Sequence, residues 1–162
     1  MRDTKKEAYI KCIQQQQAII NKILYLYADD AESKKDLRQE ILAAGWKSFE
    51  SFQGKAQFST WLYRIGLNVA FAQLRKKKRQ TYVSLQHNLQ EKQAYTTLQG
   101  EELLQAIIKQ LQPVEKSIVL LLIEGYNQKE IANLIGLSAV NVRVKVSRLR
   151  KKLETYGLKN IT

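Results

Sequence analysis

The segment 127–153 has the pattern of a helix-turn-helix, and this pattern restricts the possible folds more than any other feature of the chain. Its first four residues, 127–130, read Asn-Gln-Lys-Glu, the spacing of a capping box that opens a short helix to about Ile135. Gly136 supplies the tight turn, and Ser138 is placed to cap a second helix that runs to about Tyr156. A short helix, a tight turn and a longer second helix are therefore expected here.

The apolar residues of this segment recur at helical spacing on one side of each helix. The inward positions of the first helix are Ile131, Ala132 and Ile135, and Leu137 fills the corner. The inward positions of the second helix are Val142, Val146, Leu149 and Leu153. Their narrow stripe leaves most of the second helix facing outward, as a helix that enters a DNA groove requires.

The outward side of the second helix combines cations, amides and two valines. Asn and Arg side chains can form paired hydrogen bonds with base edges, and valines can pack on thymine methyl groups. The candidate DNA-contacting positions are Ser138, Val140, Asn141, Arg143, Val144, Lys145, Ser147, Arg148 and Lys151. The cations best placed for phosphates are Arg148, Arg150, Lys151 and Lys152. The alternative is a helical bundle whose last helix is merely basic.

The rest of the chain predicts more helices and few turns, since it contains one Pro and seven Gly in 162 residues. The predicted helices cover about 7–27, 33–49, 59–79 (capped near Ser59), 101–111 and 114–124, with a loop at 50–57. We expect an all-α fold: two small helical domains, 1–80 and 101–162, joined by a flexible linker, 81–100. His87 in that linker has no Cys or His partner nearby in the sequence, so we expect no metal site.

Each predicted N-terminal helix has an apolar stripe. The stripe of 7–27 is Ile10, Ile13, Ile20, Ile23, Leu24 and Tyr27. The stripe of 33–49 is Leu37, Ile41, Leu42 and Trp46. The stripe of 59–79 is Trp61, Leu62, Ile65, Val69 and Ala72. The predicted helix 59–79 has a second stripe at the same spacing, which consists of Arg64, Asn68, Phe71 and Arg75.

The charge distribution indicates a polyanionic partner. The net charge is +12, and the stretches 51–90 and 131–153 contain no Asp or Glu. Two separate basic surfaces favour two contacts with one nucleic acid over two merely solvated faces. The acid-free stretches also argue against an enzyme such as a nuclease, which needs a carboxylate cluster or a His. The polar N-terminus and the single cysteine, Cys12, favour a reducing cytoplasm.

Several motifs resemble those of a known family. The stretches 36–40, 52–54 and 58–65, with Trp46 and Asn68, resemble region two of the extracytoplasmic-function sigma factors of RNA polymerase. The helix-turn-helix, with Pro113 before it, resembles their region four, and region three is absent, as in that group. The resemblance covers nearly the whole chain.

The resemblance implies a role for each part of the chain. Region two would bind the clamp helices of the beta-prime subunit through Asp36, Gln39 and Glu40. It would hold the minus-ten element, with one flipped base, through Gln53, Gly54, Lys55, Phe58, Arg64, Asn68, Arg75, Lys76 and Lys77, while 75–79 holds phosphates. Region four would read the minus-thirty-five element and bind the beta flap.

The resemblance also implies which partners the protein has and which it lacks. An anti-sigma factor, which can be membrane-bound, is an expected partner, and we expect no catalysis, cofactor or small-molecule substrate. The chain departs from the family pattern at Gly66, Ala72, Asn141 and Val144, so no promoter sequence is transferred. The alternative function is a stand-alone helix-turn-helix regulator, which would bind a palindrome as a dimer.

Overall fold

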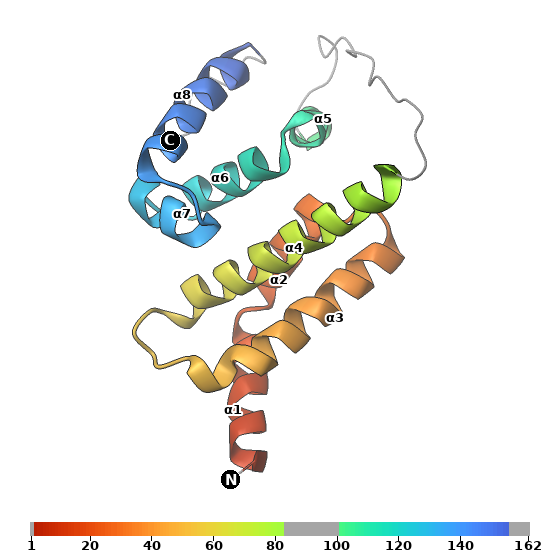
Figure 1. Ribbon diagram of the computed structural model, residues 1–162, viewed down its shortest axis with the longest axis vertical. Helices are drawn as coiled ribbons and strands as arrows, with labels where there is room; N and C mark the ends of the chain where they lie inside the picture. Colours follow the sequence, from red (N-terminus) through yellow and green to blue (C-terminus); the bar gives the residue numbers. More distant parts are fainter. Residues whose placement is uncertain (1, 83–100, 156–162) are drawn as a thin grey trace. The chain divides into compact units, whose positions relative to one another are not determined.

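The computed structural model describes residues 2–82 and 101–155, and within these ranges it contains helices and no strand. The chain divides into two compact units, 1–80 and 81–162, and each is considered by itself. The all-α prediction with a helix-turn-helix in the second unit is confirmed (Figure 1). The predicted linker lies outside the described residues except for its first two positions, which belong to a helix, and His87 and Tyr156 also lie outside them.

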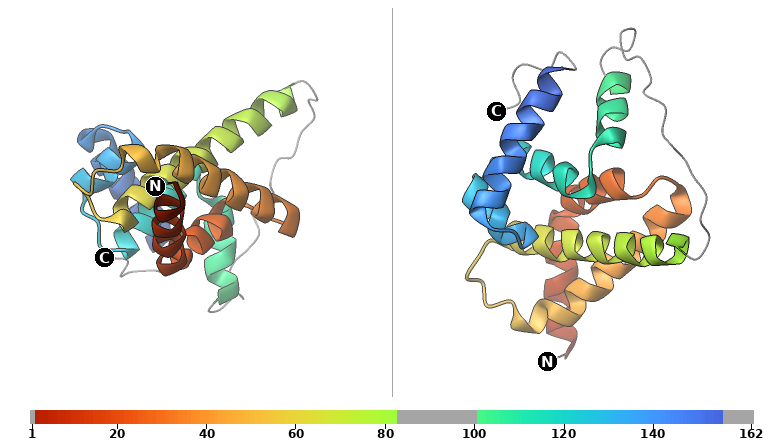
Figure 2. Two further views of the ribbon diagram at one scale, coloured as in Figure 1. Left: turned by 90° about the horizontal axis from the view of Figure 1, so that it is seen from below. Right: turned by 45° about the horizontal axis from the view of Figure 1, so that its top comes forward.

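The first unit is a small helical bundle (Figures 1 and 2). Its elements are α1 (Arg2–Gln15), α2 (Gln17–Tyr27), α3 (Ala31–Ser48), the short 3₁₀ helix η1 (Phe49–Ser51) and α4 (Phe58–Tyr82). Its fully buried core includes Ile20, Ile23, Leu37, Ile41, Leu62 and Leu67. These residues come from α2, α3 and α4, so the three helices enclose one apolar core.

The predicted helix 7–27 is in fact two helices that break at Gln16. The backbone of Gln16 has φ −119° and ψ 24°, and its N–H donates to the carbonyl of Ile13 at 3.0 Å. The break lets α1 pack against the end of α3 instead of continuing along α2. The Tyr9 hydroxyl donates to the carbonyl of Leu42 at 2.7 Å, and its ring lies 5.5 Å from that of Trp46. Burial raises the pKa of Tyr9 to about 12.

The apolar stripes predicted for the first unit are partly wrong. Trp46 is 41% exposed and Ile10 is 42% exposed, although both were placed in the core. In α4 only Leu62 of the predicted stripe is buried, and Ala72 is exposed. The face of α4 that is buried consists of Leu62, Tyr63, Gly66, Leu67 and Ala70.

The reason for the different face is close packing at small residues. A Cβ at Gly66 would lie 2.5 Å from Cδ1 of Ile23. Helix α4 therefore approaches α2 closely at Gly66, because this residue of α4 has no side chain. The start of α4 also differs from the prediction, because the helix begins at Phe58 and the carbonyl of Gln57 accepts the first helical bond, from Trp61 N–H at 3.1 Å. Ser59 therefore lies inside the helix rather than at its cap.

Substituting Gly66 tests this close approach. Gly66→Ala gains about 1 kcal/mol of helix propensity. The new methyl group would clash with Ile23, which is fully buried and has little room to move. Such overpacking of a core destabilises a protein by roughly 1–3 kcal/mol. We expect a net loss of about 1 kcal/mol in the free energy of unfolding, measured by urea denaturation. In an Ile23→Val background, which lacks the Cδ1 atom, the same change should stabilise the protein. Equal effects of Gly66→Ala in both backgrounds would contradict the packing.

The second unit contains α5 (Glu101–Gln110), α6 (Pro113–Ile123), α7 (Gln128–Ile135) and α8 (Ala139–Glu154). Pro113 is the first residue of α6 rather than a break before it, a position that suits its fixed φ and missing N–H. Gln112 caps this helix, and its N–H donates to Glu115 Oε2 at 2.8 Å. The fully buried core includes Ile107, Ile118, Leu121, Ile131 and Val142. Across the described ranges, no helix combines the length and apolarity needed to span a membrane.

Candidate nucleic-acid interfaces

The turn between α7 and α8 is held by the local bonds that the sequence predicts. The Asn127 side chain accepts from the N–H groups of Lys129 and Glu130, each at 3.0 Å, and Glu130 accepts from the Asn127 N–H at 2.8 Å. Gly136 ends α7 with φ 71°, a left-handed conformation that glycine adopts without strain. The Ser138 hydroxyl accepts from the N–H of Asn141 at 3.2 Å. The predicted caps and turn are confirmed.

The buried face of the helix-turn-helix is also confirmed. Every inward position predicted for the two helices is at most 9% exposed, and Leu134 joins them at 6%. These residues pack α8 along one narrow line, with Val142 fully buried. The opposite side of α8 therefore faces away from the core of its unit.

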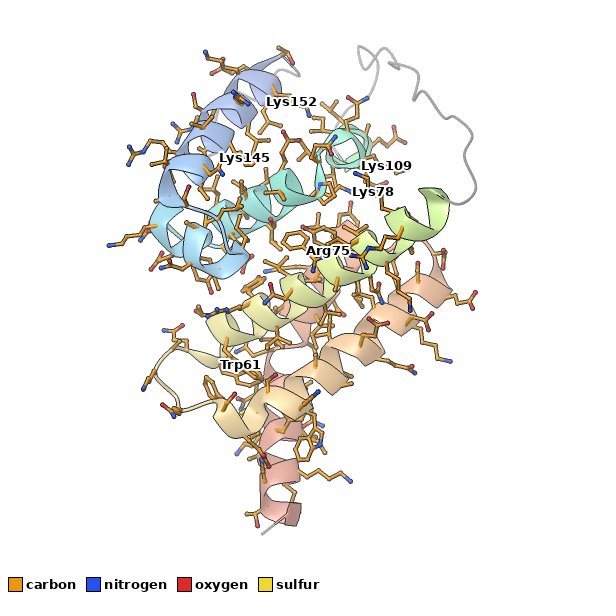
Figure 3. The ribbon with its side chains drawn as sticks, viewed as in Figure 1. Trp61, Arg75, Lys78, Lys109, Lys145 and Lys152 are labelled. Carbon is orange, nitrogen blue, oxygen red and sulfur yellow. The ribbon has the colours of Figure 1, made fainter. Side chains whose placement is uncertain are left out.

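The outward side of α8 is chemically unusual for a solvated surface. Val140 is 68% exposed and Val144 is 41% exposed, one turn apart. The exposed polar side chains around them are Asn141, Arg143, Ser147, Arg148, Arg150 and Lys151. The only acid in α8 is Glu154, its last residue, so the positive field is not offset along the helix. Lys145, a predicted contact, is half-buried at the edge of this face (Figure 3).

Lys152 differs from the other cations of α8. Its Nζ lies 3.3 Å from Glu115 Oε2 and 3.4 Å from the carbonyl of Gln110, so it ties α8 to the start of α6. From the sequence we predicted that Lys152 binds phosphates, because the sequence shows its charge but not its neighbours in the fold. In the structure it supports the packing of the unit instead.

Four aromatic side chains cluster where α3 gives way to α4. The rings of Phe49 and Phe52 stack at 6.2 Å, those of Phe52 and Phe58 meet at 5.7 Å, and Phe58 lies 5.1 Å from Trp61. All four are half-buried, so the cluster presents ring surface to solvent. Sequence reasoning missed Phe49, although the i, i+3 spacing of Phe49 with Phe52 could have indicated it.

The loop beside this cluster carries the predicted polar contacts. Gln53, Gly54 and Lys55 are all exposed, and Gly54 has φ 68°, which places a glycine at the turn of the loop. Their amide and ammonium groups flank an aromatic surface. Such a combination can stack an unpaired base on the rings and bond its edge through the loop.

A cationic stripe follows α4 away from the aromatic cluster. Arg64, Asn68 and Arg75 are exposed, and at about 100° per residue Lys78 and Arg79 lie on the same face (Figure 3). From the first to the last of these positions the helix rises about 22 Å. The stripe is long enough to face several nucleotides of a single strand.

Lys77, a predicted contact, lies on a different side of α4 from this stripe. By the same helical geometry it lies on the buried side of α4, beyond the end of the core. The pKa of the Asp30 carboxyl is lowered, first by its hydrogen bond from the Ser33 N–H at 2.7 Å, and the positive charge of Lys77 adds to this effect. Lys77 is exposed and lies apart from the cationic stripe, so its contact with DNA stays a prediction.

The outer face of α3 carries the predicted polymerase contacts. Asp36, Gln39 and Glu40 are exposed and, together with Glu32, lie within about one third of the helix circumference. They form an acidic-polar strip suited to a basic partner surface. Neither here nor in the other described residues could a group of three or more His, Cys, Asp or Glu hold a metal ion.

Comparisons with known proteins match both units. The family described as Sigma-70 region 2 matches residues 12–80, and the one described as Sigma-70, region 4 matches residues 101–153. The extracytoplasmic-function (ECF) RNA polymerase sigma factor SigG of Mycobacterium tuberculosis is 25% identical over an alignment of 161 residues, and the match covers 81% of this chain and 44% of SigG. This chain thus spans less than half the length of that relative.

Two further comparisons cover a larger share of the related protein. The ECF RNA polymerase sigma factor SigW of Bacillus subtilis is 24% identical over an alignment of 150 residues. This match covers 83% of this chain and 80% of SigW. The solved structure of the sigma factor RpoE in complex with the anti-sigma factor NepR from Bartonella quintana has a TM-score of 0.68, at 21% identity. It covers 96% of this chain and 97% of RpoE, and it shows that the fold is shared.

Proposed function

This chain belongs to the sigma-70 family of RNA polymerase sigma factors, in its extracytoplasmic-function group, and on that premise we propose that it directs promoter-specific transcription initiation. The observation that carries the proposal is that one chain has two different surfaces rich in exposed cations, one beside the aromatic cluster and one on α8. One suits unpaired bases, and the other suits the major groove of a duplex. A protein that opens a promoter needs both kinds of contact.

The first unit would capture the minus-ten element. A base turned out of the duplex would stack on the half-buried rings of Phe52 and Phe58, while Gln53 and Lys55 bond its edge. Extruding a base costs a few kcal/mol, and stacking recovers about 1–3 kcal/mol per base. The stripe of Arg64, Asn68, Arg75, Lys78 and Arg79 would then hold the backbone of the separated strand, with Lys76 beside it.

The second unit would read the minus-thirty-five element through α8. The exposed Val140 and Val144 are suited to thymine methyl groups, and Asn141 and Arg143 to base edges. Arg148, Arg150 and Lys151 would neutralise phosphates, and Ser138 would contact the backbone beside the helix N-terminus.

The proposed protein partners follow from the same premise. The strip of Asp36, Gln39 and Glu40 would bind the clamp helices of core polymerase, and the second unit would bind the beta flap. An anti-sigma factor, membrane-bound or free, is the proposed regulator, because the structurally similar RpoE was solved in complex with one. The protein would work in the cytoplasm by binding alone, without catalysis or a cofactor.

Run-off transcription with core polymerase tests the proposal. Purified protein and core enzyme from the same organism are mixed with sheared genomic DNA, and the transcript starts are mapped by sequencing. We expect starts that depend on the added chain and share upstream sequences at minus ten and minus thirty-five. Folded protein that yields the same starts as core enzyme alone would overturn the proposal.

Two substitutions in α8 separate base reading from phosphate binding. Arg148→Ala should weaken binding to every duplex and reduce the slope of log affinity against log salt by about 0.9. Asn141→Ala should leave the salt slope unchanged and alter preference at one base pair, by about 1–3 kcal/mol. Fluorescence anisotropy on a duplex library at several salt concentrations measures both quantities. If both variants lose affinity equally at every sequence, the assigned recognition face is wrong.

The alternative of a stand-alone regulator is not favoured. It uses only the helix-turn-helix and leaves the aromatic cluster and the α4 stripe without a role. It also predicts a stable dimer with a palindromic site. The match of the first unit to Sigma-70 region 2 supports the initiation function instead.

A further inference from the structure

Helix α3 has three chemically distinct faces, of which the function proposed above uses one. Leu37 and Ile41 point into the core, and the acidic-polar strip around Asp36 points outward. The third face is the set Ala31, Lys34, Lys35 and Arg38, at the spacing i, i+3, i+4 and i+7. It is centred roughly 130° from the acidic strip, by about 100° per residue. The helix therefore separates its cations from its acids.

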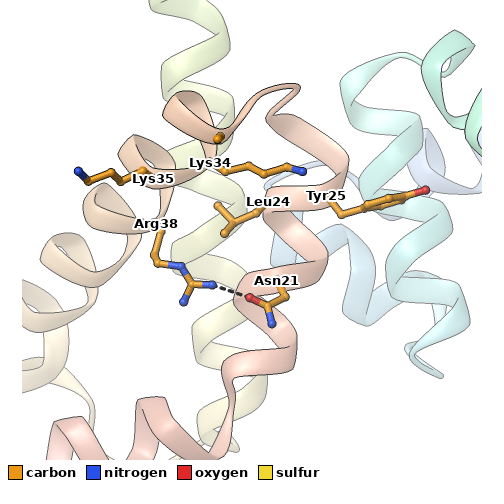
Figure 4. Close-up of a pocket in the computed structure, with 7 residues that line it drawn as sticks. Asn21, Leu24, Tyr25, Lys34, Lys35 and Arg38 are labelled. Carbon is orange, nitrogen blue, oxygen red and sulfur yellow. Dashed lines mark hydrogen bonds between the residues drawn. The ribbon is translucent and has the colours of Figure 1, made fainter.

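This cationic face borders a hollow between α2 and α3 (Figure 4). The hollow has a volume of about 500 Å³, and α2 contributes Asn21, Leu24 and Tyr25 to its lining. No Asp or Glu is among its lining residues. Its volume falls in the range of small-molecule sites, roughly 300–1,000 Å³.

The guanidinium of Arg38 is held in place by neutral groups. It donates to Gln17 Oε1 at 2.7 Å and to Asn21 Oδ1 at 2.5 Å. Neither acceptor neutralises its charge, and these bonds use two of its five N–H donors. Three donors remain in a group whose orientation is already set, which reduces the entropy lost when it binds an oxyanion.

Lys34 and Tyr25 supply a second charge and a flat apolar surface. Figure 4 shows the Lys34 side chain reaching past Leu24 toward the side of Tyr25, while Lys35 extends to the other side. The Tyr25 side chain is 46% exposed although it is large and aromatic. Leu24, which is buried, forms an apolar floor between the two cations.

We propose that this hollow binds a phosphorylated small molecule of the nucleotide class. Arg38 and Lys34 bind its phosphate oxygens, and the Tyr25 ring packs on its planar base. Arginine suits phosphate because its planar N–H groups match two oxygens at once, and lysine adds a point charge. An acidic protein segment is less well suited, since the only buried apolar residue in the lining of the hollow is Leu24.

Isothermal titration calorimetry of the full chain with ATP, without Mg²⁺ and at 150 mM NaCl, tests the proposal. We expect saturable binding of one ATP, weaker binding of inorganic pyrophosphate, and none of adenosine. This order distinguishes a site for phosphate plus base from a site for either alone. No saturable binding of ATP, or pyrophosphate that binds as tightly as ATP, would overturn the proposal.

Matched variants place the binding in the hollow. Lys34→Gln and Arg38→Gln should each weaken ATP binding by about tenfold or more, and Tyr25→Ala by about fivefold. Lys47→Gln is the control, because it removes the same charge from an exposed position of α3 outside the hollow. Its effect should stay within about twofold. Since Arg38→Gln also breaks bonds between α2 and α3, Lys34→Gln is the decisive variant. A Lys47→Gln effect as large as that of Lys34→Gln would show general charge attraction and overturn the site.

Discussion

Val142→Asp is expected to unfold the second unit and leave the first unit folded. Val142 is fully buried where α8 packs on the rest of its unit, so an aspartate there would place a carboxylate in an apolar core. A carboxyl group in an apolar core either stays charged and unpaired or takes up a proton to become neutral. In both cases it destabilises the unit, by roughly 4 kcal/mol or more. A small helical unit has a total stability of about that size. Circular dichroism at 222 nm should therefore lose about two fifths of its helical signal at 25 °C.

The matched control lies two residues earlier in α8. Val140→Asp makes the same chemical change at a side chain that is 68% exposed, so it should alter the free energy of unfolding by less than about 0.5 kcal/mol. Its added charge would nevertheless face DNA phosphates, so duplex binding should fall sharply. A Val142→Asp protein that melts like the unsubstituted chain would contradict the buried face assigned to α8.

The second large effect is expected from the cationic stripe of α4. In the variant Arg75→Gln, Lys78→Gln and Arg79→Gln, three phosphate contacts are lost, which reduces the salt slope for single-stranded DNA by about 2. The affinity advantage of the unsubstituted chain should then shrink about 20-fold between 50 and 200 mM salt. Anisotropy of a labelled oligonucleotide, with the sigma factor bound to core polymerase, measures the slope.

Two controls separate position from total charge. The variant Lys6→Gln, Lys11→Gln and Lys47→Gln removes three exposed charges from the same unit but away from α4, and its slope should change by less than about 0.5. Lys77→Gln alone should also change the slope little, because Lys77 lies on the other side of α4 from the stripe. Equal slopes for the two triple variants would show that net charge, not the stripe, determines binding.

Most of the helix-turn-helix could be predicted from the sequence, and the reason is that its determinants are local. The capping box at 127–130, the left-handed Gly136 and the Ser138 cap each involve residues within four positions of one another. The candidate groove-facing residues followed directly, since a helix with a known buried stripe has a known outer face.

The N-terminal unit was predicted less well because its packing depends on residues far apart in the sequence. The spacing of Trp61, Ile65 and Val69 suggested a buried stripe, but the core instead takes the face where Gly66 meets Ile23. In the same way, the helix break at Gln16 directs α1 so that the ring of Tyr9 lies beside that of Trp46, which stays partly exposed. No periodicity within one helix reports which neighbour will approach it.

The sequence by itself determined the helical class, the two acid-free surfaces and the geometry of the helix-turn-helix, because helix periodicity, caps and charge runs are properties of short segments. The tertiary structure alone decided which face of α4 is buried, and it showed that Lys152 bonds to Glu115 and that Arg38 borders a hollow with Tyr25. Each of these depends on the distance between side chains on different helices, which a linear pattern does not contain. Charge can therefore be read from the sequence, whereas the partner of each charge is set by packing.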